Sequence, residues 1–107
     1  MSEKRNWKIR VYDILDCIQA IEGFTESLSC DDFCKNRMVF DAVVRNIEII
    51  GEAVKNIPDE ILVRYPEIKW RQVKGIRDVI VHEYGIVRKP GIWSVVGDEL
   101  PLLKEVV

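Results

Sequence analysis

Apolar residues recur every three or four positions along the first quarter of the chain. The repeating positions are Trp7, Val11, Ile14, Ile18 and Ile21. Charged and polar residues fill the places between them, so the apolar side chains would share one face of an α-helix. We predict an amphipathic helix from about Asn6 to Phe24.

The same rhythm returns over about five helical turns in the middle of the chain. Its apolar positions are Phe40, Val43, Ile47, Ile50, Val54 and Ile57. Pro58 cannot continue a helix, because it lacks an N–H group and its ring clashes with the preceding turn. Gly51 lies inside this helix at a cost of up to about 1 kcal/mol relative to Ala. We therefore expect another helix to approach closely at Gly51.

Short helices are predicted beside these two. Ser29, followed three residues later by Asp32, resembles a capping box, with Asp in place of the usual Glu or Gln. After Pro58, Asp59 is expected to cap a short helix that runs through Arg64 and ends at the Tyr65–Pro66 pair.

The last third of the chain predicts two more helical regions. Trp70, Val73, Ile76 and Ile80 form an apolar stripe that should end near Tyr84 and Gly85. Residues 89–91, Lys-Pro-Gly, are expected to be a linker. The closing stretch, 92–107, is predicted to be helical with a break at Gly97, where Asp98 caps a last helix that accepts Pro101 in its first turn.

These patterns contain no alternation typical of β-strands. The prediction is an all-α protein, a small antiparallel up-and-down helical bundle with about four main helices plus short ones. Its 107 residues, 48% hydrophobic and 32% charged, have the balance of one ordinary domain spanning residues 1–107.

The sequence also predicts where in the cell the protein lies and whether it needs a metal or a cofactor. No segment approaches the run of about 20 apolar residues that crosses a membrane, and the charged N-terminal stretch does not resemble an export signal. We expect a cytoplasmic protein in which Cys17, Cys30 and Cys34 are reduced thiols. Cys30 and Cys34 could share a helix face, but zinc normally needs four ligands, so we expect no metal and no cofactor.

Positive charge is concentrated in one part of an acidic chain. The formal net charge is −2, yet the segment from Arg64 to Lys89 holds seven basic and three acidic residues. The whole molecule is thus not held to nucleic acid by bulk charge. The basic cluster coincides with the segment from Arg77 to Tyr84, which reads RDVIVHEY.

This segment contains the only histidine of the chain, His82. Asp78 lies four residues earlier, so on a helix it projects from the same face and can orient the imidazole. Arg77 lies five residues before His82, which is roughly 140° around an ideal helix. That angle is wide for one small site.

Three arrangements could bring Arg77 and His82 to one substrate. The arginine side chain is long, and the helix could unwind locally near His82. Alternatively, two chains related by a two-fold axis would give one cleft two arginines and two histidines. Cleavage of RNA by a ribose 2′-hydroxyl needs a base, an acid and a cation, and histidine titrates in the useful pH range.

Ordinary structural roles explain each of these residues equally well when it is taken alone. A lone histidine on a helix is more often a surface residue than a catalyst, and an adjacent Arg77–Asp78 pair is usually a surface ion pair. Tyr84 at a helix end is usually a partly buried anchor. A purely structural helical domain does not explain why positive charge gathers around His82.

The chain resembles the HEPN superfamily, specifically the HepT-like toxin of a two-gene module whose partner is a minimal nucleotidyltransferase. Four blocks carry the resemblance over nearly the whole chain. They read VYDILDCIQAIEGFT, DAVVRNIEIIGEAVKNIP, YPEIKWRQVKGIRDVIVHEY and IWSVVGDELPLLKE. The last two blocks together are the more specific part, because an Arg-x4-His spacing alone is common.

The resemblance implies a metal-independent endoribonuclease that acts on RNA as a homodimer. The Arg-x4-His motif of the family falls on Arg77 and His82, and its polar residue falls on Asp78. Tyr84 matches the tyrosine to which the partner nucleotidyltransferase antitoxin attaches AMP, silencing the toxin. Basic residues that could contact the RNA backbone are Lys74, Arg71, Arg88 and Lys89.

One departure from the family follows the motif. Gly85 stands where such proteins usually carry Phe, which removes an aromatic wall from the expected cleft, while Arg88 and Lys89 add positive charge. A second function stays open at this point. It is a non-catalytic helical dimer that binds a nucleotide or docks the nucleotidyltransferase.

Overall fold

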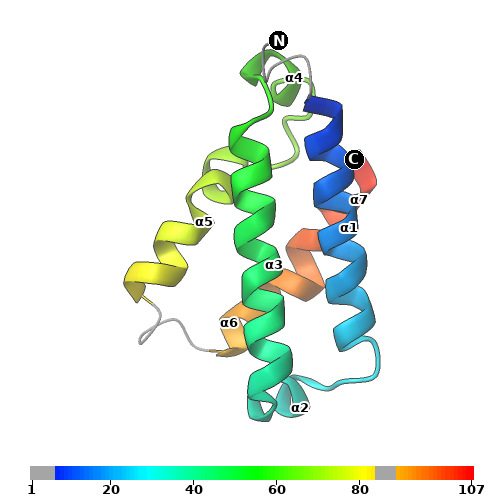
Figure 1. Cartoon of the computed structure of the whole chain (residues 1–107), viewed down its shortest axis with the longest axis vertical. Helices are drawn as coiled ribbons and strands as arrows, with labels where there is room; N and C mark the ends of the chain where they lie inside the picture. Colours follow the sequence, from blue (N-terminus) through cyan, green and yellow to red (C-terminus); the bar gives the residue numbers. More distant parts are fainter. Residues whose placement is uncertain (1–6, 84–88) are drawn as a thin grey trace.

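The computed structural model describes residues 7–83 and 89–107, with side chains except those of residues 77–83 and 89–90. In chain order the elements are α1 (Trp7–Thr25), α2 (Cys30–Lys35), α3 (Arg37–Lys55), α4 (Asp59–Leu62), α5 (Trp70–Glu83), α6 (Lys89–Ser94), the π-helical turn η2 (Val95–Glu99) and α7 (Leu100–Val106). The long helices α1 and α3 run antiparallel side by side (Figure 1). Helix α5 lies on the side of α3 that faces away from α1 (Figure 1). At the C-terminal end of the chain, α6 packs on α2 and α7 packs on α1.

The core lies between α1 and α3 and is closed by the short helices. From α1 it receives Ile14, Ile18 and Ile21, each at most 1% exposed. All six apolar positions predicted for the middle helix are buried. Phe33 of α2 is fully buried against Phe40 and Trp93, with ring centroids 5.6 and 5.0 Å away. Both predicted stripes are therefore confirmed as core-facing.

Polar caps fix where the helices at the α2–α3 corner begin. The predicted capping box is present, because the Asp32 backbone N–H donates to Ser29 Oγ at 3.1 Å and the Ser29 N–H donates to Asp32 Oδ2 at 3.2 Å. Asn36 Oδ1 accepts from the Val39 N–H at 3.1 Å and so caps α3. Each cap satisfies backbone N–H groups that have no partner within the helix.

The connection after α3 differs in two details from the prediction. The helix ends at Lys55, two residues before Ile57, and Asn56 forms the turn. Asp59 does not cap α4, because Pro58 is the residue before the helix and its carbonyl accepts from the Ile61 N–H. The Asp59 carboxylate instead accepts a hydrogen bond from Lys74 of α5.

The predicted linker at residues 89–91 is wrong, since these residues form the first turn of α6. Proline is tolerated there because an N–H in the first turn of a helix needs no partner within the helix. Two apolar residues anchor the helix: Ile92 is 4% exposed and Trp93 packs on Phe33. Burial of these side chains outweighs the local preference of Pro-Gly for a loop.

The predicted break at Gly97 is also wrong, because the chain continues through the wider turn η2 into α7. Asp98 lies inside η2 and does not cap α7, which is preceded by Glu99. Pro101 occupies the first turn of α7 as predicted. In a regular helix its ring would clash with the carbonyl four residues earlier, at Gly97, and a π turn relieves this clash.

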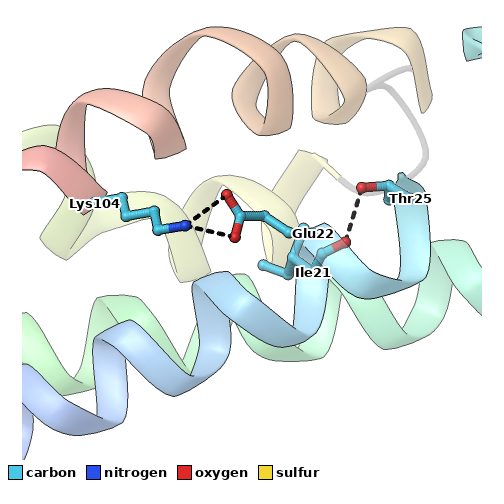
Figure 2. Close-up of polar contacts among 4 residues, drawn as sticks. All are labelled: Ile21, Glu22, Thr25 and Lys104. Carbon is cyan, nitrogen blue, oxygen red and sulfur yellow. Dashed lines mark hydrogen bonds and ion pairs between the residues drawn. The ribbon is translucent and has the colours of Figure 1, made fainter. Parts of the chain in front are cut away.

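A surface ion pair joins α7 to the last turns of α1 (Figure 2). Lys104 Nζ of α7 lies 2.9 and 3.3 Å from the two carboxylate oxygens of Glu22 in α1. One turn further along α1, the buried hydroxyl of Thr25 donates to the Ile21 carbonyl at 2.8 Å. The buried hydroxyl of Thr25 therefore has a hydrogen-bond partner. The same end of α1 also contacts α7 through Glu22.

The all-α prediction is confirmed, since no strand occurs in residues 7–83 or 89–107 and the long helices form an antiparallel bundle. Within these same ranges, no helix is both long and apolar enough to span a bilayer.

The expected close contact at Gly51 is confirmed. A Cβ atom added to Gly51 would lie 3.0 Å from Cγ2 of Ile76 and 3.1 Å from the Val73 carbonyl oxygen, both in α5. These distances are shorter than ordinary van der Waals contact. Only the absence of a side chain at Gly51 lets α5 approach α3 this closely.

We predict that Gly51→Ala destabilises the protein by up to about 2 kcal/mol. The added methyl group pushes against the Val73 carbonyl, and overpacking typically costs about 1–3 kcal/mol, which exceeds the roughly 1 kcal/mol gained from the higher helix propensity of Ala. Urea unfolding followed by circular dichroism measures the change.

Gly75→Ala in α5 is the matched control. Nothing lies within 4 Å of the Cβ it would add, so its expected effect is a gain of up to about 1 kcal/mol from helix propensity. Equal stabilisation by both substitutions would contradict the close contact at Gly51.

Candidate functional site

Helix α5 carries the sequence motif that predicts chemistry. Arg77, Asp78 and His82 all lie on this one helix, which spans Trp70–Glu83. Asp78 and His82 are four residues apart in a continuous α-helix, so they lie on the same face of it. The structure thus brings these three positions together on one element, as the spacing predicts.

Other predicted site residues lie beyond what the structure describes. Tyr84 and Arg88 are outside the described residues, and Lys89 is placed only as the first residue of α6. For Arg77, Asp78 and His82 the structure gives the course of the helix and not the side chains. Their proposed roles therefore stay predictions.

Because α5 is a regular helix, one of the three arrangements that could bring Arg77 and His82 to one substrate is not observed. The backbone is α-helical through Glu83, so the local unwinding considered for the helix end near His82 is not observed. The two positions are separated by roughly 140° around the helix axis. Only the reach of the arginine side chain or the approach of a second chain can then bring both groups to one phosphate.

Two contacts hold the first half of α5 in place. Its start is fixed by the Trp70 indole N–H, which donates to the Tyr65 carbonyl at 3.0 Å. One turn later, Lys74 Nζ lies 2.9 Å from Asp59 Oδ1 and ties α5 to α4. Arg77 lies three positions after Lys74, so these contacts and the Gly51 approach determine where the motif lies relative to the bundle.

The Lys74–Asp59 ion pair changes the expectation for Lys74 as an RNA contact. The Asp59 side chain is 84% exposed and that of Lys74 32% exposed, so the pair lies at the surface and contributes little to stability. It does offset the positive charge of Lys74. Arg71, one turn earlier on α5, is exposed and is the better placed of the two to meet a phosphate.

A groove of about 740 Å³ runs along the first half of α5. Its floor comes from three parts of the fold, with Ile50 from α3, Val73 and Ile76 from α5, and Leu100 and Leu103 from α7. Ile76 is the residue next to Arg77, so the groove reaches the start of the motif.

Both signs of charge occur on the rim of this groove. Glu67, Asp98 and Glu99 are acidic, whereas Lys69 and Arg71 are basic. The apolar floor is unsuited to a polyanion and resembles a surface that another protein covers, whereas Arg71 is exposed at the rim. We therefore distinguish the groove from the polar part of α5 that holds the motif.

The described part of the chain offers no candidate for a conventional metal centre. No group of three or more His, Cys, Asp or Glu side chains gathers there in a way that could hold an ion.

The groove and the Lys74–Asp59 pair were not predicted from the sequence. Both join residues far apart in the chain, and a local pattern carries no information on such pairings. One signal was available, because Leu102 and Val95 fall in an amphipathic C-terminal region whose apolar positions exceed what one helical stripe requires. Leu102 is 49% exposed at the edge of the groove.

Comparisons with known proteins give the family. A family model described as "Ribonuclease HepT-like" matches residues 14–107. A protein of Methanocaldococcus jannaschii named "Putative RNase" is 38% identical over 102 residues, which cover 95% of this chain and 84% of that protein. A second protein with that name from the same organism is 35% identical over 98 residues, covering 92% and 81%.

A further relative comes from Thermococcus cleftensis and is named "Probable ribonuclease HepT". It is 40% identical over 101 residues, which cover 94% of this chain and 92% of that protein. No solved structure gives a significant match. The family model and these relatives cover most of the chain, including the whole of α5, and confirm the resemblance drawn from its motifs. The chain belongs to the ribonuclease HepT-like family of the HEPN superfamily.

Proposed function

We propose that this protein is a metal-independent endoribonuclease and the toxin of a cytoplasmic toxin–antitoxin module. The observation that carries the proposal is the position of Arg77, Asp78 and His82 on one helix of a chain that belongs to a ribonuclease family. The relatives named as ribonucleases support RNA as the substrate.

The chemistry uses side chains that the motif supplies. One imidazole of His82 removes the proton from a ribose 2′-hydroxyl, whose oxygen attacks the adjacent phosphorus. A second imidazole gives a proton to the departing 5′-oxygen, which leaves a 2′,3′-cyclic phosphate. Arg77 stabilises the negative charge of the phosphorane, and Asp78 orients the imidazole.

A homodimer supplies the two imidazoles, because each chain contains one histidine. The groove beside α5 supports this arrangement. Its apolar floor would lose contact with water when a second copy covers it, and burial of apolar area favours association. Because the groove ends next to Arg77, a dimer formed there brings the two α5 helices close to each other.

Regulation is proposed at Tyr84, which follows the last helical residue of α5, Glu83. A partner nucleotidyltransferase would transfer AMP to its hydroxyl, forming a phosphodiester and releasing pyrophosphate from ATP. The added phosphate brings negative charge close to the motif, where it competes with an RNA phosphate for Arg77. The modified toxin is expected to be inactive.

We predict that His82→Ala and Arg77→Ala each lower the rate of RNA cleavage at least about 100-fold. General acid–base catalysis and charge stabilisation each contribute factors of that size. The measurement is cleavage of a labelled RNA by purified protein in the presence of a chelator. Gln19→Ala, an exposed substitution on α1, is the control and should keep the activity.

Two results would contradict this mechanism. One is a His82→Ala protein that cleaves RNA at the rate of the unsubstituted protein. The other is activity that the chelator abolishes, which would indicate a metal-dependent reaction. Nucleotide or nucleotidyltransferase binding without cleavage would favour the non-catalytic dimer.

We also predict that Arg71→Gln weakens RNA binding more than Lys74→Gln does. Arg71 is exposed, whereas the charge of Lys74 is offset by Asp59 at 2.9 Å. Loss of one phosphate contact lowers the slope of log affinity against log salt by about 0.7 for a single strand. Fluorescence anisotropy in the His82→Ala background measures both quantities.

The reciprocal variant tests the ion pair directly. Asp59→Asn frees Lys74 from its carboxylate partner, so RNA binding should become tighter and more salt-dependent. An Arg71→Gln protein with unchanged affinity and slope would rule out this face of α5 as an RNA contact.

Finally, co-expression with a neighbouring nucleotidyltransferase gene should raise the intact mass of this protein by one or more AMP units. The shift should disappear in Tyr84→Phe and persist in Tyr12→Phe, whose side chain is 68% exposed on α1. A mass shift retained in Tyr84→Phe would exclude Tyr84 as the site.

A further inference from the structure

Helix α5 contains a glycine, Gly75, for which the fold gives no reason. Glycine is the least favourable residue in a helix interior apart from proline. At Gly51 the close approach of α5 requires it, but a Cβ added at Gly75 would meet nothing within 4 Å in the described part of the chain. The backbone at Gly75 is ordinary α-helix, so no unusual dihedral angle requires glycine either. A local preference broken without a structural gain is typical of a functional position.

Gly75 lies on the same face of α5 as Arg71 and part of the motif. Arg71 lies four residues before Gly75. Asp78 and His82 lie three and seven residues after it, and these spacings place all four positions on one face of the helix. At 1.5 Å per residue, Arg71 and His82 are about 16.5 Å apart along the helix axis. Gly75 therefore lies between the exposed basic residue and the proposed proton-transfer group.

The described part of this face is open to another molecule. The Arg71 side chain is exposed, and Gly75 is partly exposed at the edge of the apolar groove. Because glycine has no side chain, a ligand can approach the helix backbone more closely there than at a residue with a Cβ. A strand that contacts Arg71 and His82 together has to cross this turn of the helix.

We infer that Gly75 is part of the RNA-binding surface, and that the RNA strand runs along α5 from the motif over Gly75 to Arg71. The inference rests on the proposed ribonuclease function. Charge favours a polyanion on this path, because Arg71 offers a phosphate its guanidinium at one end. A second copy of the chain is proposed to cover the apolar floor of the groove, which is a different surface of the same helix.

On this path a side chain at position 75 would hold the strand away from α5 and so away from Arg71. The glycine thus lowers the stability of the helix and strengthens the binding of RNA. These two effects have opposite signs, which separates a role in binding from a role in folding.

Gly75→Ala and Gly75→Gln test the inference through both effects. Each should raise the melting temperature by a few degrees, because Ala and Gln favour a helix more than Gly does. Each should also weaken binding of a labelled single-stranded RNA, by a few fold for Ala and at least about tenfold for the longer Gln, since a charged hydrogen bond to phosphate is lost. Fluorescence anisotropy in the His82→Ala background measures the affinity. A substitution that only damages the fold would lower both quantities.

The course of the strand also predicts coupling between Gly75 and Arg71. In the Gly75→Gln protein, adding Arg71→Gln should weaken binding no further, because the strand has already lost that contact. Either substitution should lower the slope of log affinity against log salt by about 0.7. The matched control is Gly23→Gln on α1, where an added Cβ also meets nothing within 4 Å. It should leave RNA affinity and the salt slope unchanged.

Three results would overturn the inference. The first is RNA binding by Gly75→Gln as tight as that of its parent, and the second is additive losses from the Gly75 and Arg71 substitutions. The third is a changed oligomeric mass of Gly75→Gln in light scattering, which would place Gly75 under a second copy of the chain. Failure of the proposed function gives a different result, because His82→Ala would then cleave RNA at the unsubstituted rate whatever the Gly75 variants bind.

Discussion

The close approach of α3 and α5 at Gly51 is the contact on which the position of the proposed site depends. α5 makes its most extensive contact with α3, and a Cβ at Gly51 would lie 3.0 Å from the Ile76 side chain. Because Ile76 precedes Arg77, this contact fixes the position of the motif along α3 and its rotation about the axis of α5. The Lys74–Asp59 pair and the Trp70 hydrogen bond act on the same half of the helix. They limit how α5 can pivot about the glycine.

Periodicity predicted the two main helices well because their buried faces are decided by local spacing. Six apolar positions of α3 recur at helical intervals and all are buried. The errors lie where a distant partner overrides a local preference. Asp59 is a good cap residue, yet it bonds to Lys74, fifteen positions away. Pro90 and Gly91 favour a loop, yet burial of Ile92 and contact of Trp93 with Phe33 draw them into α6. No local pattern contains these partners.

The sequence was sufficient to predict which helix carries the candidate site, but not what surrounds that helix. Arg77, Asp78 and His82 lie on one regular helix, as their spacing and the apolar stripe of α5 indicate. Whether Arg77 and His82 serve one substrate depends on what faces α5. The groove that decides this brings Ile50, Val73 and Leu103 together from three separate helices, and such a convergence is a property of the whole fold.

The division of α5 into two halves explains how a small acidic protein can act on a polyanion. The first half is committed to packing, through Gly51 on one side and the apolar groove on another. Basic residues cannot occupy these faces, and the exposed Arg71 lies at the rim of the groove instead. In the proposed function, this separation lets the bundle stay acidic overall while a short positive segment meets the phosphates. Attraction would then act only near the motif, and it would orient an RNA strand toward Arg77 and His82 instead of holding it over the whole surface.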